Sequence, residues 1–218
     1  MERFAIITGG GLGTRMNEGT PKQFLLLDDM PVIMHTIRQF ESFCSNIIIS
    51  LPEDYHLFWA DLQKKHHFSV PHTLVSGGKT RFDSVKNALQ CVSDEGLVAI
   101  HDAVRPFASQ NLIEKCFNEA EKCGNAVAAL PLTESLRIVD KDTNKSVDRK
   151  LFYRMQTPQV FKCSEIKAAY NQDYRSTFTD DATVLESLGG RIYLVDGEEQ
   201  NFKITTPMDM LLAESLIK

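Results

Sequence analysis

Long apolar runs are missing from this sequence of 218 residues. A helix that crosses a bilayer needs roughly 20 consecutive apolar residues, and no run in the chain approaches that length. The first apolar run, residues 4–8, is also far too short for the core of a signal peptide. We therefore expect a cytoplasmic protein that does not bind a membrane.

Paired cysteines and an excess of basic charge are missing as well. The five cysteines include no Cys-x-x-Cys pair, so they indicate neither a disulfide framework nor a zinc site. The formal net charge is -5, whereas non-specific binding to nucleic acid usually requires a broad basic face. We expect no nucleic-acid partner, and an anionic ligand would have to be held by a few locally placed cations.

Short apolar segments alternate with segments of helical period along most of the chain. The apolar segments, rich in β-branched residues, predict strands at 4–8, 46–51, 97–100, 126–130 and 191–195. Helix start signals and periodicity predict helices at 32–43, 55–65, 85–92, 112–123, 164–174 and 180–188, and a last one after Thr206-Pro207. This alternation predicts one α/β domain over residues 1–218, with a doubly wound, mainly parallel, Rossmann-like sheet and a ligand crevice at the carboxyl ends of its strands.

The segment from about 133 to 157 breaks this alternation. Two strand-like stretches flank a polar turn at 140–145, which predicts a protruding β-hairpin arm. A hairpin that stands away from its domain is only marginally stable by itself. We therefore expect a second subunit to cover the arm, which makes the protein a homodimer.

A glycine cluster follows the first predicted strand, in the sequence GGGLGTRM at 9–16. Glycine backbone can approach a phosphate closely and offer its N–H groups, so the cluster predicts a phosphate-binding loop. Its glycines are Gly9, Gly10, Gly11 and Gly13. Arg15 and Lys22 follow closely enough for both to bind one triphosphate. Either residue alone would more often be a solvated surface charge, but their spacing after a glycine loop predicts phosphate binding.

Two other glycine motifs are excluded by spacing. The dinucleotide fingerprint G-x-G-x-x-G fails because Thr14 stands where the third glycine is required. This weakens the hypothesis of a hydride-transfer enzyme. Gly78-Lys79-Thr80 is similar to the end of a P-loop, but Thr73 occupies the position of its first glycine.

Several motifs in the same order give the chain a more specific resemblance. GGGLGTRM at 9–16 is followed by PKQ at 21–23, GGKTR at 77–81, HDAVRPF at 101–107, TPQ at 157–159, TDDA at 179–182 and KITTP at 203–207. Together they resemble the 2-C-methyl-D-erythritol 4-phosphate cytidylyltransferase family over nearly the whole chain. The resemblance implies transfer of CMP from CTP to methylerythritol phosphate, with release of pyrophosphate, in the non-mevalonate route to isoprenoid precursors.

The same resemblance implies roles for individual residues. It gives catalytic roles to Arg15, Lys22 and Lys203, and nucleotide binding to Gly9, Gly10, Gly11, Gly13, Gly77, Gly78 and Ser84. It gives polyol phosphate binding to Asp102, Arg105 and Thr157, and to Ser135 and Arg149 donated across the dimer. Mg²⁺ would be held mainly by the CTP phosphates, with Asp102 as a candidate ligand. The chain departs from the family at Lys79, where many relatives carry an acidic residue.

Two further hypotheses stay open at this point. Ribitol 5-phosphate cytidylyltransferases share the same loop motifs, and fold alone does not separate the two substrates. A non-catalytic module that senses nucleotides is a hypothesis of another class, and the complete set of cations argues against it.

Overall fold

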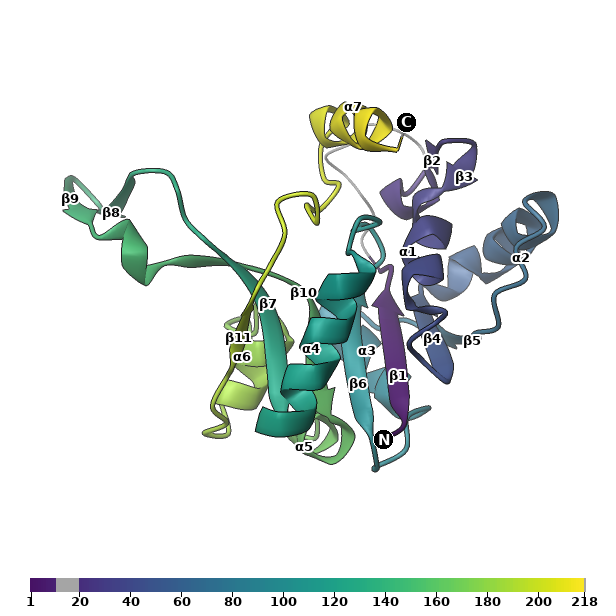
Figure 1. Ribbon diagram of the computed structural model, residues 1–218, viewed down its shortest axis with the longest axis horizontal. Helices are drawn as coiled ribbons and strands as arrows, with labels where there is room; N and C mark the ends of the chain where they lie inside the picture. Colours follow the sequence, from purple (N-terminus) through teal and green to yellow (C-terminus); the bar gives the residue numbers. More distant parts are fainter. Residues whose placement is uncertain (11–19, 218) are drawn as a thin grey trace.

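A computed structural model describes residues 1–10 and 20–217 of the chain (Figure 1). Within these residues the main sheet has seven strands in the order β11-β7-β10-β6-β1-β4-β5. The strands are β1 (Arg3–Thr8), β4 (Asn46–Leu51), β5 (Thr73–Ser76), β6 (Leu97–Asp102), β7 (Asn125–Pro131), β10 (Tyr153–Lys162) and β11 (Leu194–Asp196). Only β10 runs antiparallel to its neighbours, β6 and β7. The prediction of a mainly parallel, doubly wound sheet is confirmed.

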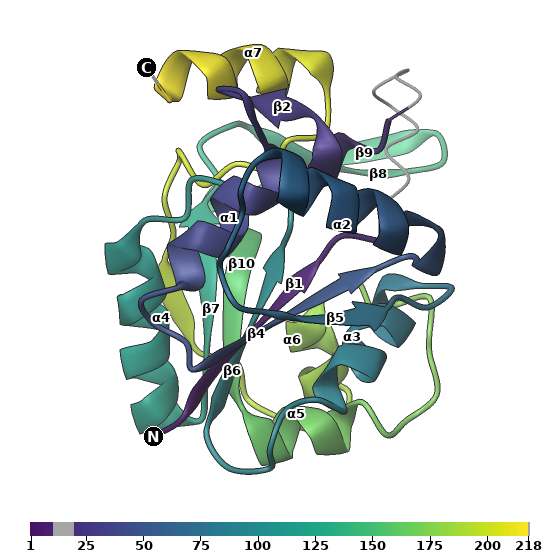
Figure 2. The ribbon, with the colours of Figure 1, turned by 90° about the vertical axis from the view of Figure 1, so that its right-hand side faces the viewer.

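Helices cover both faces of this sheet (Figure 2). One face packs against α1 (Val32–Phe40), α2 (His56–Lys65) and α4 (Gln110–Cys123). The other packs against α3 (Arg81–Leu89), α5 (Cys163–Ala169) and α6 (Asp181–Glu186). A further helix, α7 (Pro207–Leu216), lies beside the short hairpin of β2 (Leu26–Leu27) and β3 (Met30–Pro31). None of these helices combines the length and apolarity that crossing a membrane requires.

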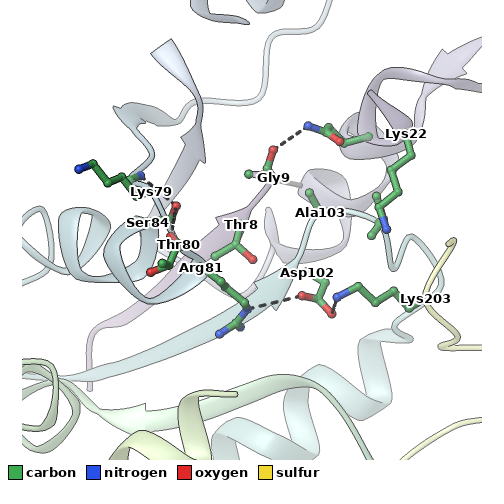
Figure 3. A pocket seen from close by; sticks show the side chains of 14 residues that line it. Thr8, Gly9, Lys22, Lys79, Thr80, Arg81, Ser84, Asp102, Ala103 and Lys203 are labelled. Atoms are coloured by element: carbon green, nitrogen blue, oxygen red, sulfur yellow. Dashed lines mark hydrogen bonds and ion pairs between the residues drawn. The ribbon is translucent and has the colours of Figure 1, made fainter. Parts of the chain in front are cut away.

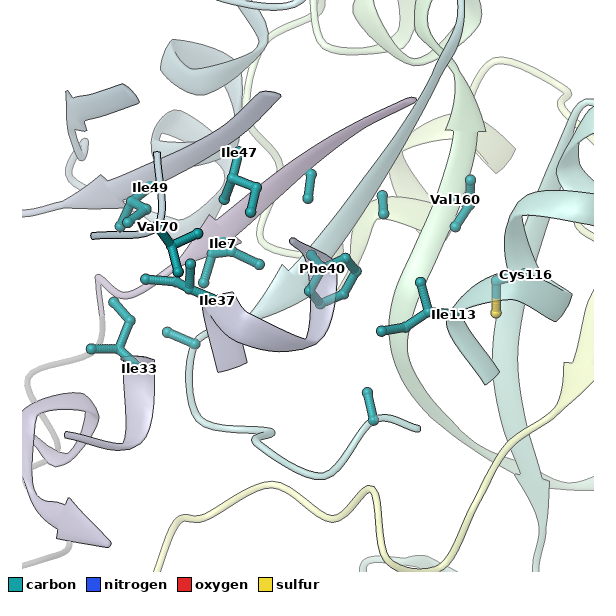
Figure 4. Packing of buried hydrophobic residues seen from close by; sticks show 14 of the residues in the cluster. Ile7, Ile33, Ile37, Phe40, Ile47, Ile49, Val70, Ile113, Cys116 and Val160 are labelled. Carbon is teal, nitrogen blue, oxygen red and sulfur yellow. The ribbon is translucent and has the colours of Figure 1, made fainter. Parts of the chain in front are cut away.

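Strand β1 shows why its sequence is a continuous apolar run. Successive side chains of a strand point to opposite faces of the sheet. Ala5 and Ile7 therefore belong to the core under α1, α2 and α4, whereas Phe4 and Ile6 belong to the core under α3, α5 and α6. Figure 4 shows the first of these cores, with Ile7 packed among side chains from α1 and β4. Burial on both faces is typical of parallel strands and removes the alternation of polar and apolar residues.

The order of the strands fixes where a ligand can bind. Strand β1 lies between β4 and β6, and its last residue, Thr8, pairs with Ser50 on one side and Asp102 on the other. The carboxyl ends of three neighbouring strands therefore meet at one edge, where doubly wound proteins bind their ligands.

The sequence-based predictions differ from the structure most clearly at β5 and around the arm. Strand β5 was not predicted, and the first half of β10, residues 153–157, was expected to belong to the arm. The hairpin itself is confined to β8 (Leu136–Asp140) and β9 (Thr143–Val147). Residues 153–157 belong to the main sheet instead, since Tyr153 pairs with Pro131 and Met155 with Ala129 of β7. Figure 1 shows the hairpin standing away from the rest of the protein.

Helix α3 begins earlier than the predicted residue 85. Thr80 accepts a hydrogen bond from the Asp83 N–H, and the Asp83 side chain accepts one from the Thr80 N–H. Such a capping box stabilises a helix start that the apolar period alone does not indicate. It also places Arg81 in the first turn of the helix, directly after the GGKTR glycines. The same device begins α7 at the predicted Thr206-Pro207.

Candidate active site

A pocket lies at the carboxyl ends of β1 and β6, where the strand order predicts a ligand site (Figure 3). It brings together residues from four separate parts of the chain. The predicted site residues that line it are Gly9, Gly10, Lys22, Gly78, Ser84, Asp102 and Lys203. These residues come from the segment after β1, the start of α3 with the loop before it, the end of β6 and the segment before α7, and they meet at the carboxyl edge of the sheet.

The other predicted site residues lie in three different places. Arg105 and Thr157 line an adjoining cavity that shares Asp102 and Lys203 with the pocket. Ser135 and Arg149 belong to the exposed arm, and the structure does not bring them to either cavity. Gly11, Gly13 and Arg15 lie outside the described residues.

Gly9 is shaped by its neighbours. Its N–H donates to the Ser50 carbonyl at 2.9 Å, and its carbonyl accepts from the Gln23 side chain at 2.6 Å. A Cβ atom at this position would lie 2.6 Å from a methyl carbon of Leu51, closer than side chains tolerate. The Gly9 N–H is already bonded within the protein. We therefore expect Gly9 to let a ligand approach the backbone closely rather than to donate its N–H to that ligand.

The second glycine pair is held in the same way. The Gly77 N–H donates to the Leu51 carbonyl at 2.7 Å, and the Gly78 N–H donates to the Ser84 hydroxyl at 3.0 Å. A Cβ atom on Gly78 would lie 2.2 Å from the Cβ of Asp83. Both N–H groups are therefore used to hold the loop in shape. We expect the two glycines to contribute to nucleotide binding by letting the nucleotide approach the backbone closely.

Asp102 is the centre of charge in the site. Its carboxylate lies 3.0 Å from Arg105 Nε, 3.1 Å from Lys203 Nζ and 3.9 Å from Arg81 Nε. Burial by itself would raise the pKa of this carboxyl, but the three cations outweigh burial and hold the pKa well below its ordinary value. Asp102 is therefore ionised at neutral pH and cannot serve as a general acid there.

Arg81 connects the loop to a buried anion. It donates two parallel hydrogen bonds to Asp181, at 2.8 and 2.6 Å, and Tyr170 donates a third to the same carboxylate at 2.6 Å. Asp181 is fully buried, and a buried charge needs compensation. These three donors supply it. The pairing was missed by sequence reasoning, although both residues stand in motifs of the resemblance, because they are 100 positions apart.

His101 is a buried residue next to Asp102. Its ring is fully buried, and Nε2 donates to the Arg105 carbonyl at 3.0 Å. Burial lowers the pKa of His101 to about 4, so the ring is neutral at physiological pH. The residue supports the turn between Asp102 and Arg105.

The pocket is basic although the chain is acidic. In the part of the chain that the structure describes, its lining includes Lys22, Lys79, Arg81 and Lys203 but only one acidic side chain, Asp102. Among the described residues, no group of three or more His, Cys, Asp and Glu side chains is arranged to hold a metal ion. The fold and this pocket define a doubly wound α/β protein with a basic pocket at the carboxyl edge of its sheet, which suits an anionic ligand.

Comparison with known proteins identifies the family. Residues 4–218 match the family of 2-C-methyl-D-erythritol 4-phosphate cytidylyltransferases, and the chain belongs to that family. The enzyme of that name from Porphyromonas gingivalis is 46% identical over 99% of this chain and 98% of its own length. The one from Phocaeicola vulgatus is 43% identical over the full length of both chains.

Solved structures agree with this assignment. The 2-C-methyl-D-erythritol 4-phosphate cytidylyltransferase of Thermus thermophilus has a TM-score of 0.79 and 28% identity, covering 99% of this chain and 98% of that one. The 4-diphosphocytidyl-2C-methyl-D-erythritol synthase of Anaerococcus prevotii has a TM-score of 0.84 and 28% identity, covering 99% and 96%.

Proposed function

We propose that this chain transfers CMP from CTP to 2-C-methyl-D-erythritol 4-phosphate, giving 4-diphosphocytidyl-2-C-methyl-D-erythritol and pyrophosphate for isoprenoid precursor biosynthesis. The observation that carries the proposal is the basic pocket around Asp102, in a chain that matches this family over residues 4–218. The relatives at 46% and 43% identity bear the methylerythritol name, so ribitol 5-phosphate is not the favoured substrate.

The chemistry needs alignment and charge neutralisation more than proton transfer. The nucleophile is a phosphate monoester, whose second pKa of about 6 leaves it mostly dianionic at neutral pH. A general base is therefore not required, which agrees with a neutral His101 and an ionised Asp102. The reaction gains most from cations placed where negative charge grows on the α-phosphate.

We assign that role to Lys22 and Lys203, together with Arg15. Lys22 and Lys203 line the same pocket as Gly9 and Gly10. On the polyol side, Arg105 and Thr157 line the adjoining cavity, and the Asp102 carboxylate can accept hydrogen bonds from substrate hydroxyls.

The proposed reaction also requires Mg²⁺ as a cofactor. The described residues offer no protein cage for it, and the Asp102 carboxylate is already paired with three cations. Both observations suit an ion held mainly by the CTP phosphates. When bound, the ion neutralises phosphate charge.

The active unit in this proposal is a homodimer in which each arm completes the neighbour's site. The arm exposes large apolar side chains, including Val139 at 71% and Leu151 at 79%. Exposed apolar groups on an arm that stands away from its domain favour a covering partner. Ser135 and Arg149 would reach the polyol phosphate of the neighbouring subunit from this arm.

The nucleotide preference provides the first test. With Mg²⁺ and methylerythritol phosphate, we expect rapid pyrophosphate release from CTP and much slower release from UTP or ATP, because a site that binds the cytosine edge leaves polar groups unpaired with another base. A pyrophosphate assay with each nucleotide measures this. Equal rates with all three would refute the cytidine assignment.

A further inference from the structure

Asn201 lies in the segment between β11 and α7, close to the polyol side of the site. The residue is fully buried. Its side-chain Nδ2 donates to the Thr157 carbonyl at 2.7 Å. Its own backbone carbonyl accepts from Arg105 Nη1 at 2.8 Å. One residue therefore contacts two of the groups assigned to the polyol phosphate.

The same segment also carries Lys203. Two residues after Asn201, the Lys203 ammonium lies 3.1 Å from the Asp102 carboxylate. The next residue, Ile204, is fully buried and donates its N–H to the Val104 carbonyl at 2.9 Å. Lys203 is thus held between two buried anchors, Asn201 on one side and Ile204 on the other.

The two polar atoms of the Asn201 side chain differ in their hydrogen bonding. A carbonyl oxygen at 2.7 Å requires the Nδ2 donor to face Thr157, which fixes the orientation of the amide. Among the described residues, the buried Oδ1 has no hydrogen-bond partner. The amide is needed here for its Nδ2 donor, because an apolar side chain of the same shape would leave the Thr157 carbonyl without this hydrogen bond.

We propose that Asn201 is a positioning residue for the polyol phosphate half of the site. Its side chain fixes Thr157, its carbonyl fixes Arg105, and its anchored backbone fixes the start of the segment that carries Lys203. This inference rests on the proposed function, since the substrate concerned is the polyol phosphate.

The test replaces Asn201 by Asp, which keeps the shape but turns a carboxylate oxygen toward the Thr157 carbonyl, and by Ser, which is a milder change. Misplacement by about 1 Å can cost roughly 10²-fold in rate. We expect the KM for methylerythritol phosphate to rise about tenfold or more, with the KM for CTP within about twofold, because the 77–84 loop is built by other contacts.

Asn125 provides a matched control. It is also buried, donates Nδ2 to the Arg191 carbonyl at 2.8 Å and accepts from the Tyr193 N–H at 3.0 Å. It begins β7, which places it at the opposite edge of the sheet from the site. Asn125→Asp and Asn125→Ser are expected to lower Tm while leaving both KM values unchanged.

The outcomes separate this inference from the proposed function. If wild type is active but Asn201→Ser lowers only Tm and leaves the KM for methylerythritol phosphate unchanged, as the Asn125 variants do, the positioning role is wrong. Asn201→Ser decides the matter if Asn201→Asp does not fold. If wild-type protein releases no pyrophosphate, the proposed function fails first.

Discussion

Lys22→Ala is expected to lower kcat by roughly 10²–10³-fold, the scale of removing one pre-organised donor to a transition state. Lys22 begins the short helical turn Lys22–Phe24, is only 9% exposed and lines the pocket beside Gly9. A cation held in this way is positioned before the substrate arrives, so its loss affects the transition state most. Steady-state kinetics with saturating CTP and methylerythritol phosphate measure the change.

Lys64→Ala is the control for this experiment, because the Lys64 side chain is 81% exposed on α2. It should leave kcat unchanged. Arg15→Ala is expected to behave as Lys22→Ala does, and Arg15→Lys should also be impaired because one ammonium does not reproduce a fork of donors. Near-normal turnover of Lys22→Ala would remove Lys22 from the catalytic set.

Mixing Arg149→Ala protein with Lys22→Ala protein is expected to restore activity that neither has alone. If each arm serves the neighbour's site, a hybrid dimer holds one site with both defects and one site with neither. Independent sites then give at most about half of wild-type activity per hybrid dimer. Activity measured after subunit exchange, with exchange followed by differently tagged chains, provides the test.

No recovery despite demonstrated exchange would place Arg149 in its own subunit's site or outside any site. Mixing Lys22→Ala with Lys203→Ala is the control, since both residues line one pocket within a single chain. That mixture should recover nothing, because every site in the hybrid then carries one of the two defects.

The parallel core strands could be predicted because burial on both faces leaves a continuous apolar signal, as in β1. Strand β10 could not, because it begins with exposed residues that read as part of the arm. The start of α3 was also missed, because it depends on the Thr80–Asp83 capping box rather than on apolar period.

The candidate site shows a similar division. Local motifs identified Gly78, Ser84 and Asp102, which the structure brings into one pocket. The Arg81–Asp181 pair and the contacts of Asn201 join residues far apart in sequence, so no local pattern could indicate them.

The most direct test of the central claim is a competition between substrates. Wild-type protein is incubated with CTP, Mg²⁺ and equal concentrations of methylerythritol phosphate and ribitol 5-phosphate, and the CDP-linked products are identified by mass spectrometry. We predict that 4-diphosphocytidyl-2-C-methyl-D-erythritol predominates. A product mixture dominated by CDP-ribitol, or the absence of both products, would contradict the account.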